Sequence, residues 1–526
     1  MKQREERESR RQEEWASAAR NHQNNLILTA LALCGVVVHL LFYQNLEFHR
    51  DELLYFSLGE HPDSGYFSVP PLIGILAAGI TKIFGYNLFA AKILPALLGG
   101  VMVYLAAKMA KELKGTFFAQ VMAAIGLMCS IMFLRTYSLF QPVFLDVFFW
   151  TITLYLLLRY INSAHNRYFY LLGIAIGLGI LNKYNLLFLL TALLMILPFT
   201  KMRKILLSKE FYVMLLIAFV LILPNVIWQI THHLPVLSHL IELKKSQLEK
   251  MSNVTFLAEQ LLLIYPATFI ALPGIFYLLF SRKVIDFRWI GYSIMVVLLL
   301  YLALHGKTYY TAGIYPLLIS AGAVFYEKLL QNKFLRAGLI IALLLLTWSI
   351  LPMGIPSKPP EKLVAYFNKM AQVTGNDAVR RYENNKYNPL PQDYADMLGW
   401  KELTAITNRA WLQVEHKDQC IIYAENYGQA GAITILGKKY NLPEAISFSD
   451  SYRYWIPKTF DREMTAMIYI NFEVGIDVEI LFGDIREIGR VTNPLAREFG
   501  TQVYLCKNPR SSLNKFWESR IQKSNQ

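Results

Sequence analysis

The sequence contains few cysteines, and their positions define no metal-binding module. Four occur among 526 residues, and none has a partner at the spacing of a zinc site. Cys34 and Cys129 fall within apolar runs, where buried free thiols are expected. Cys420 and Cys506 fall in the polar C-terminal region, and their positions are compatible either with a disulfide or with plain burial of two strand thiols.

Acidic residues are also scarce. The chain has 38 Asp and Glu residues against 52 Lys and Arg residues, a net charge of +14. No nucleic-acid-binding motif accompanies this excess, so we exclude nucleic acid as a partner. In membrane proteins Lys and Arg collect in cytoplasmic loops, which explains the charge without a polyanion. Residues 1–25 are too long and too mixed in charge for the start of a signal peptide, and they predict a cytoplasmic tail.

Long apolar runs are abundant. Hydrophobic residues make up 55% of the chain, and runs near 20 residues recur, which indicates a polytopic α-helical membrane protein. We predict about eleven spans (10–13) within residues 26–352, and the loops between them carry basic clusters alternately. The expected spans are 26–43, 87–108, 116–135, 139–160, 167–182, 184–199, 210–230, 256–280, 289–304, 309–329 and 337–352. The charge bias places the N-terminus in the cytoplasm.

Two stretches within this region differ from ordinary spans. Residues 50–84 contain a short apolar segment that opens on a Pro pair, and a residue before Pro is disfavoured in a helix. We therefore predict short interfacial helices in this first outer loop, with a break at residues 69–71. The run GIAIGLGI at 173–180 has small residues at helical spacing, which favours close helix packing.

The composition changes after the last span. Residues 353–360 are a Pro-rich linker, and 361–526 have the ordinary polarity of a soluble domain. Helix and strand patterns alternate there, which predicts a small α/β domain on the outer side. The predicted strands are 419–424, 466–471, 478–482 and 502–506, and the predicted helices are 361–373, 399–414 and 428–439.

Three carboxylates near the membrane are candidates for chemistry. Asp51 and Glu52 follow the first span, as a general base or a metal ligand, or as a solvated pair that caps a helix start. Asp146 lies among Phe and Trp near the start of a span, and an acid there needs a partner. Its partner is either a substrate or a structural cation such as Arg135.

Several cations violate the charge bias of the topology. Arg50, Arg135, Lys183, Lys244, Lys245 and Lys307 fall on the outer side. Lys183 and Lys307 stand at span junctions, where an ammonium group suits a lipid phosphate, although both residues are also placed to snorkel to the headgroups. Tyr309 and Tyr310 follow Lys307 and fit either a phosphate site or the aromatic interfacial belt.

The order of the motifs resembles the bacterial glycosyltransferase family 39, which includes protein O-mannosyltransferases and lipid A aminoarabinose transferases and has the GT-C membrane fold. The resemblance covers about residues 45–330 and rests on the DE pair, GYFSVPPL, ALLGG, LDVFFW, GLGILNKYNLLFLL, LPNVIWQ and GKTYYTAGIYPLL, in this order. QDYADMLGW, NYGQAGAI and SYRYW, at 392–400, 426–433 and 451–455, resemble the C-terminal domain of bacterial relatives.

The resemblance implies roles for individual residues. Asp51 matches the acidic residue at the centre of the first outer loop, Glu52 and Tyr55 match its neighbours, and Asp146 matches a second acidic site. The implied donor-phosphate site consists of Lys183, Lys307, Tyr309, Tyr310 and Arg135. Tyr55, His61 and Tyr66 are the expected substrate-pocket residues.

The chain departs from the family at two places. Ser68 and Val69 stand where relatives carry Glu-Lys or Asp-His before the loop proline, so a divalent metal ion, with Asp51 or Asp146 as a ligand, stays open as a cofactor. Leu54 replaces an Arg of the aminoarabinose transferases, so their acceptor is not carried over.

These features predict an inverting glycosyltransferase of the bacterial inner membrane. It moves a sugar from a polyprenyl-phosphate donor to a lipid, glycan or protein acceptor at the outer face. The alternative is a transporter or flippase of lipid-linked sugars, a class that usually has paired repeats, and we find no clear repeat. A third reading is a non-catalytic receptor that uses its C-terminal domain.

Overall fold

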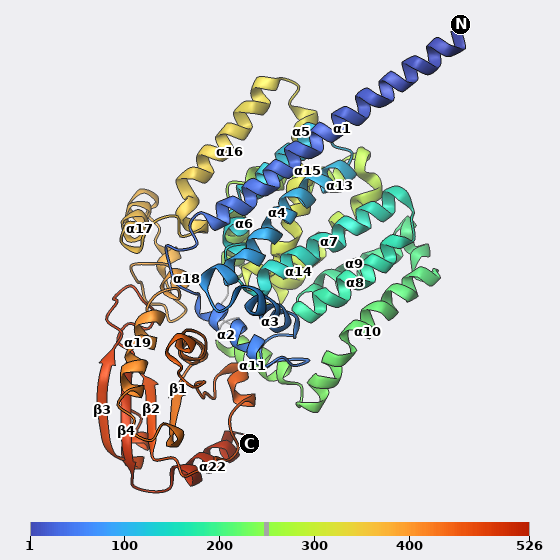
Figure 1. Ribbon diagram of the computed structural model, residues 1–526. Helices are drawn as coiled ribbons and strands as arrows, with labels where there is room; N and C mark the ends of the chain where they lie inside the picture. The colour runs from blue at the N-terminus through green and yellow to red at the C-terminus, as the bar shows by residue number, and fades with distance from the viewer. Residues whose placement is uncertain (1, 247–251, 525–526) are drawn as a thin grey trace.

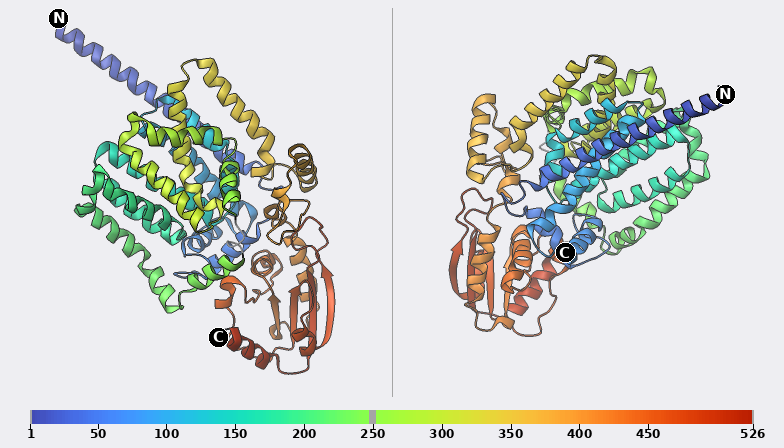
Figure 2. Two further views of the ribbon diagram at one scale, coloured as in Figure 1. Left: turned by 180° about the vertical axis from the view of Figure 1, so that it is seen from behind. Right: turned by 45° about the horizontal axis from the view of Figure 1, so that its top comes forward.

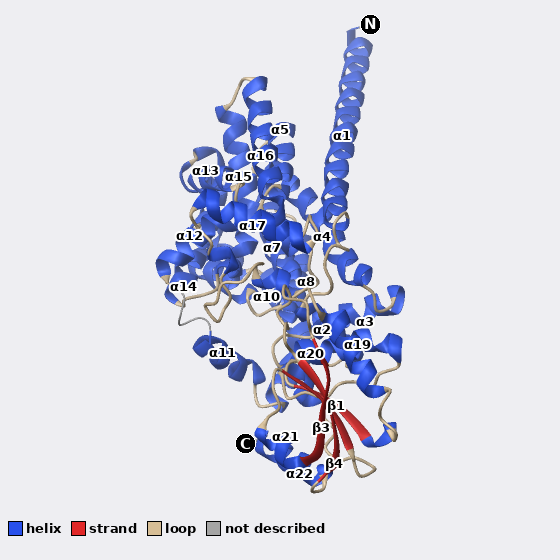
Figure 3. Ribbon diagram, turned by 90° about the vertical axis from the view of Figure 1, so that its left-hand side faces the viewer, coloured by secondary structure: helices blue, strands red, loops and turns tan. Residues whose placement is uncertain are grey.

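The computed structural model describes residues 2–246 and 252–524 and has two parts, a helical bundle and a C-terminal sheet domain (Figure 1). The sheet domain and the N-terminal half of α1, which projects alone beyond the bundle, lie at opposite ends of the molecule (Figures 1 and 3). The bundle helices are α1 (Lys2–Leu40), α2 (Arg50–Glu60), α3 (Leu72–Phe84), α4 (Leu88–Glu112), α5 (Phe117–Met128), α6 (Ile131–Thr136), α7 (Pro142–Ser163), α8 (Arg167–Asn182), α9 (Leu186–Ile196), α10 (Lys209–Thr231), α11 (Pro235–Ser246), α12 (Asn253–Leu263), α13 (Thr268–Phe280), α14 (Arg288–Ala303), α15 (Tyr315–Leu329) and α16 (Lys333–Gly354).

Among the described residues, 6 helices are long and apolar enough to cross a membrane, or up to 8 if each of two bent helix pairs counts as one span. Three shorter apolar helices, α3, α5 and α8, accompany them. The chain is thus a multi-pass helical membrane protein, while the predicted number of eleven spans is not confirmed.

Some predicted spans are interrupted. The predicted span 256–280 consists of α12 and α13, which meet at 107°, and a bend of 112° follows the predicted span 184–199, between Phe199 and Lys201. Pro266 lies at the first of these breaks, and the residue before a proline is disfavoured in a helix. The predicted span 116–135 is divided at Cys129 and Ser130, where the Ser130 side chain caps the start of α6.

The segment 50–84 forms short helices, as predicted. Helices α2 and α3 are separated at residues 61–71, and α3 begins directly after the Pro pair. The small-residue run in α8 also packs closely, as predicted. A Cβ atom on Gly173 would lie 2.7 Å from the Met214 carbonyl oxygen of α10, and one on Gly177 would lie 2.7 Å from Leu221.

The C-terminal domain is built on one four-stranded sheet. Its strands are β1 (Cys420–Ala424), β2 (Ala466–Asn471), β3 (Phe482–Arg490) and β4 (Gln502–Pro509), in the order β1-β2-β4-β3. Strands β1 and β2 are parallel, and the other two pairs are antiparallel. The helices of this part are α17 (Pro360–Thr374), α18 (Gln392–Ala395), α19 (Trp400–Trp411), α20 (Tyr427–Gly431), α21 (Ile476–Leu481) and α22 (Leu513–Ser524).

The strand predictions were correct except at one place. Residues 478–482 were predicted as a strand, but Ile476–Leu481 is helix α21, with Asp477 and Glu479 in its first turn. Acidic side chains in the first turn stabilise a helix, and the β-branched residues concealed this signal. Strand β3 follows and was missed because it is largely exposed and mixed in polarity.

The two C-terminal cysteines do not form a disulfide. Both thiols are buried and free, Cys420 on β1 and Cys506 on β4. Strand β2 lies between these strands, so the two backbones are about 9–10 Å apart, beyond the reach of a disulfide. Plain burial is therefore the correct alternative.

One hydrophobic core joins the two parts. The cluster that fills the bundle also contains Leu53 and Leu54 of α2, Trp400 and Leu403 of α19, and Ile468 of β2. A separate cluster, which includes Phe482 and Trp517, covers the other face of the sheet. Two further views show the sheet against the end of the bundle that carries α2 and α3 (Figure 2). Helix α2 is therefore enclosed between the membrane helices and the C-terminal domain.

Candidate active site at the start of helix α2

The start of α2 is fixed by a capping box. His49 is the N-cap, its Nδ1 accepts the Asp51 backbone N–H (3.1 Å), and its own backbone N–H donates to Glu52 Oε2 (2.9 Å). Such reciprocal bonds satisfy N–H groups that a helix start otherwise leaves without partners. The alternative prediction that the carboxylate pair caps a helix start is therefore correct for Glu52.

Glu52 is fully buried and has no room for a substrate. Its Oε1 forms an ion pair with Lys92 of α4 and accepts the Phe140 backbone N–H (2.9 Å). Both oxygens therefore have partners within the protein. The prediction that Glu52 takes part in catalysis stays a prediction, and the geometry favours a role in holding α2 in place.

Asp51 is in a different environment, although it is adjacent to Glu52 in the sequence. Its side chain is 28% exposed. Oδ2 accepts a hydrogen bond from Gln141 Nε2 (3.0 Å), and Oδ1 accepts one from the Tyr427 hydroxyl of α20 (2.8 Å). The carboxylate of α2 is thus held by a residue at the start of α7 and by a residue of α20, and it still reaches solvent. A carboxylate that is oriented and accessible is suited to accept a proton from a bound molecule.

The two lysines predicted at the outer side share the Tyr309 ring. Lys183 Nζ lies 5.0 Å from the centre of the Tyr309 ring and 4.7 Å from that of Tyr310. Lys307 Nζ lies 5.9 Å from the Tyr309 ring centre. These four predicted phosphate-site residues are therefore brought together, although 124 positions of sequence separate the two lysines (307 minus 183).

The electrostatic interactions connect this lysine pair to both predicted acids. Burial lowers the pKa of Lys183, Lys307 lowers it further, and the Asp146 carboxylate opposes both effects. Burial also lowers the pKa of Lys307, while Glu383 and Asp51 raise it. Two ammonium groups close together in a partly dry site are poorly compensated and favour an additional anion.

Asp146 lies behind Lys183, inside the bundle. It is buried in α7, and its Oδ2 accepts a hydrogen bond from Asn185 Nδ2 (2.7 Å). Asn185 Nδ2 also lies 2.9 Å from the Tyr310 carbonyl oxygen. The alternative that Asp146 pairs with Arg135 is wrong, because Arg135 forms an ion pair with Asp393 of α18 and lies over the Tyr394 ring.

Arg135 is thus directed to the C-terminal domain, and no described contact joins it to the lysine pair. Two of the three predicted substrate-pocket residues also have partners within the protein. The Tyr66 hydroxyl lies 3.0 Å from the carbonyl oxygens of Leu58 and His61. His61 Nε2 lies 2.7 Å from Glu444 Oε1, and its ring stacks on Trp455 at 4.0 Å.

Tyr55 is the pocket candidate that lies near the chemistry. It is one helical turn after Asp51, and burial raises the pKa of its hydroxyl. Asp51, Tyr427 and Tyr309 raise this pKa further, so Tyr55 lies within electrostatic reach of these groups. Its hydroxyl therefore stays protonated at neutral pH.

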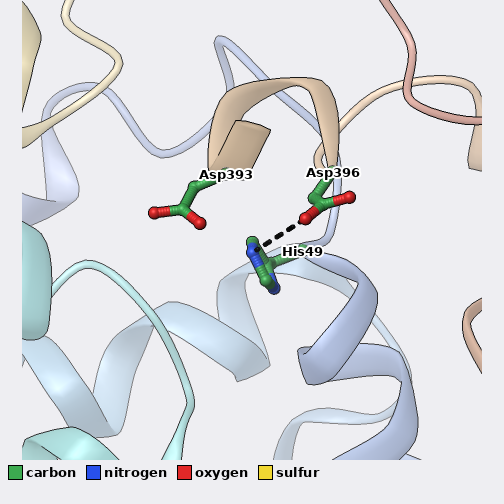
Figure 4. Close-up of side chains that lie close together, drawn as sticks. All are labelled: His49, Asp393 and Asp396. Atoms are coloured by element: carbon green, nitrogen blue, oxygen red, sulfur yellow. Dashed lines mark ion pairs between the residues drawn. The ribbon is translucent and has the colours of Figure 1, made fainter. Parts of the chain in front are cut away.

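Three potential metal ligands gather beside the site, at His49, Asp393 and Asp396 (Figure 4). Arg135 is paired with Asp393, and Arg497 Nη1 lies 3.2 and 3.1 Å from the two oxygens of Asp396. Burial lowers the pKa of His49 to about 3. Its Nδ1 accepts the Asp51 N–H, so the ring proton stands on Nε2, 4.0 Å from Asp396.

These residues do not fit a divalent ion. Both carboxylates are neutralised by guanidinium groups, and the nitrogen that faces them carries a proton instead of a lone pair. Burial raises the pKa of Asp396 to about 6, with Arg497 and Arg50 acting in the opposite direction. In the described part of the chain, Asp51 and Asp146 belong to no group of three metal-ligating side chains.

Sequence reasoning missed four residues that shape the site. They are His49, Lys92, Gln141 and Tyr427. Tyr427 belongs to the NYGQAGAI motif, which resembled C-terminal domains of relatives without indicating a role. Lys92 and Gln141 act through contacts far apart in sequence, for which a single sequence carries no signal. His49 acts locally, and its position three residues before Glu52 at a helix start is the available signal.

Comparisons with known proteins agree with this description. Residues 68–228 match the family described as dolichyl-phosphate-mannose-protein mannosyltransferase. No curated protein is significantly similar to the chain in sequence. The crystal structure of ArnT from Cupriavidus metallidurans bound to undecaprenyl phosphate is similar with a TM-score of 0.62 and 12% identity, over 91% of this chain and 97% of that one. Its apo state gives a TM-score of 0.60 with the same identity and coverage.

The predicted resemblance to glycosyltransferase family 39 is therefore confirmed, and the chain has the fold of GT-C membrane glycosyltransferases.

Proposed function

We propose that this protein transfers a sugar from a polyprenyl-phosphate donor to an acceptor at the outer face of the bacterial inner membrane. The observation that carries the proposal is the gathering of Lys183 and Lys307 around Tyr309, within electrostatic reach of Asp51. A phosphate fits between two ammonium groups, and a base beside it fits an acceptor hydroxyl. A similar fold binds undecaprenyl phosphate in ArnT, which supports this donor class.

The proposed reaction is a single displacement that inverts the anomeric carbon. The acceptor hydroxyl oxygen bonds to this carbon as its proton passes to Asp51, and the bond from the carbon to the phosphate oxygen breaks. The polyprenyl phosphate leaves with the electron pair, so negative charge grows on its oxygens. Lys183 and Lys307 stabilise this charge, and each contact lowers the barrier by about 2–4 kcal/mol, as single electrostatic donors do in other enzymes.

The other candidate residues receive supporting roles in the proposal. Asp146 keeps Lys183 charged and in position, and Tyr310 with Tyr309 forms the wall of the phosphate site. Tyr55 lines the pocket beside the base. Glu52 holds the start of α2, and Tyr66 stabilises the following loop through the Leu58 and His61 carbonyl groups. Arg135 and His61 hold the C-terminal domain against the bundle.

The topology completes the proposal. Residues 1–25 are the cytoplasmic tail, 26–352 the transmembrane catalytic domain, 353–360 the linker and 361–526 the extracytoplasmic domain. The projecting N-terminal half of α1 and the sheet lie at opposite ends of the bundle, as this orientation requires (Figure 3). No observation favours the transporter or flippase alternative.

Thin-layer analysis of radiolabelled lipid-linked sugars tests the proposed function directly. Purified protein, incubated with these donors and a membrane extract as the acceptor source, should convert the donor into a labelled product and free polyprenyl phosphate. The yield should be the same after treatment with EDTA, because the His49 cluster offers no free ligands for a divalent ion. Movement of the donor across vesicles without product would instead favour a transporter.

Loss of the Lys183 charge should impair mainly the use of the donor. For Lys183→Ala we expect the donor KM to rise by about 10- to 100-fold, which corresponds to one charge-assisted hydrogen bond of about 1.5–3 kcal/mol. Lys438→Ala is the matched control, because Lys438 also lies over a tyrosine ring, that of Tyr86, but is paired with Glu60. An unchanged response of Lys183→Ala to donor concentration would remove this residue from the phosphate site.

A further inference from the structure

The NYGQAGAI motif places α20 of the C-terminal domain directly against α2. Asn426 caps the helix by accepting the backbone N–H groups of Gly428 (2.9 Å) and Gln429 (3.0 Å). A Cβ atom on Gly431 would lie 2.9 Å from Leu53 Cβ and 3.1 Å from the Leu53 carbonyl carbon. A side chain there would force the two helices apart. Glycine at this position therefore brings the first residue of α20 to the first turn of α2.

That first residue is Tyr427, and it contacts the proposed base. Its hydroxyl donates to Asp51 Oδ1 at 2.8 Å, and the Arg50 guanidinium lies 4.3 Å from the centre of its ring. Burial raises the pKa of this hydroxyl, and the Asp51 carboxylate raises it further, so Tyr427 remains a hydrogen-bond donor at neutral pH. The cation over the ring and the carboxylate at the hydroxyl hold the side chain at both ends.

Two donors from different parts of the molecule each hydrogen-bond to one oxygen of the Asp51 carboxylate. Gln141, from the membrane part, occupies Oδ2, and Tyr427, from the C-terminal domain, occupies Oδ1. Each donor stabilises the ionised form, and together they fix the rotation of the carboxylate. A base must be ionised and correctly aimed before it accepts a proton, and both conditions depend here on the C-terminal domain.

We propose that Tyr427 is a positioning residue for the transfer reaction and that the C-terminal domain thereby completes the active site. The inference rests on the proposed function in one respect, the role of Asp51 as the base. It excludes the view that residues 361–526 act only as a receptor or an accessory. The other contacts of this interface hold the domain in place, whereas the Tyr427 hydroxyl acts on the reacting group.

Tyr427→Phe tests the proposal with a single oxygen removed and the ring retained over Arg50. Tyr452→Phe is the matched control, because Tyr452 donates to Ser57 Oγ of the same helix α2 (2.7 Å) and has no hydrogen bond to Asp51. The first readout needs no substrate. Infrared difference spectra of the purified protein report the hydrogen bonds of the Asp51 carboxylate, through the frequency of the carboxylate stretching band that is missing in Asp51→Asn.

In Tyr427→Phe the frequency of the Asp51 carboxylate band should shift, because the carboxylate loses the hydrogen bond that Tyr427 donates to Oδ1. Tyr452→Phe should leave this frequency unchanged. With the lipid-linked donor, kcat of Tyr427→Phe should fall about tenfold and the donor KM should stay constant, because the base is less well positioned while the phosphate site is intact.

An Asp51 band frequency that is the same in both tyrosine variants would overturn the inference, whether or not transfer is observed. A fall in activity that Tyr452→Phe reproduces in full would also overturn it, because the effect would then be structural. If the wild type transfers no sugar while the Asp51 band frequency still shifts in Tyr427→Phe, the hydrogen bond is present as described and the proposed function fails instead.

Discussion

Asp51→Asn should lower the transfer rate by about 100- to 10,000-fold, the usual contribution of a general base, while the protein remains folded. The amide has the size of the carboxylate and retains an oxygen that accepts the hydrogen bond of Tyr427 or Gln141. It has no basic oxygen, however, so the proton of the attacking hydroxyl has no acceptor. Turnover of labelled lipid-linked sugar by the detergent-purified variant is the measurement.

Donor binding separates this chemical effect from a loss of structure. Lys183 is the C-cap of α8 and Lys307 precedes α15, and neither forms a described hydrogen bond or ion pair with Asp51, which acts on Lys307 only at a distance. Undecaprenyl phosphate should therefore bind Asp51→Asn with an affinity close to that of the wild type. Asp63→Asn is the matched control, because Asp63 lies in the same loop but accepts its hydrogen bond from Trp228 Nε1 (2.9 Å). Near-wild-type turnover of Asp51→Asn would mean that another group is the base.

Glu52→Gln should produce the largest loss of stability, although it changes the residue beside Asp51. The substitution leaves the Lys92 ammonium buried with no negative partner, and only 5% of Lys92 is exposed. Removal of one member of a buried ion pair usually costs about 3–5 kcal/mol. We expect a clear fall of the thermal unfolding temperature. The measurement is the intrinsic tryptophan fluorescence of the protein in detergent as it is heated.

The double variant Glu52→Gln with Lys92→Met should recover part of this loss, because no buried charge then remains unpaired. The control is Asp418→Asn, which breaks the exposed ion pair with Arg462 and should leave the unfolding temperature unchanged. If Glu52→Gln unfolds at the wild-type temperature but loses activity, the predicted catalytic role of Glu52 would replace the structural one.

The difference between Asp51 and Glu52 shows a limit of what the sequence alone predicts. A DE pair at the start of a helix reads as one feature, because both residues are acidic and lie in the same polar loop. In the helix, neighbouring side chains diverge by about 100°, so Glu52 enters the bundle towards Lys92 while Asp51 faces Gln141 and Tyr427. Only the packed environment assigns them separate roles.

The C-terminal domain shows a second limit. Its motifs QDYADMLGW, NYGQAGAI and SYRYW were visible in the sequence, but their contacts with the helical bundle were not. Asp393 meets Arg135, Tyr427 meets Asp51, and Trp455 meets His61. Each of these pairs joins residues more than 250 positions apart, and local patterns carry no information at that distance.

Hydropathy and charge alone determined that the chain is a multi-pass membrane protein with a C-terminal α/β domain, because apolar runs and the placement of lysines follow from the energetics of the bilayer. The same charge bias singled out Lys183 and Lys307. Tertiary structure decided where helices bend, as in the 107° break between α12 and α13, since a hydropathy window does not register direction. It also decided which acid stays open to solvent, because burial and pairing depend on neighbours that the chain brings together only when it folds.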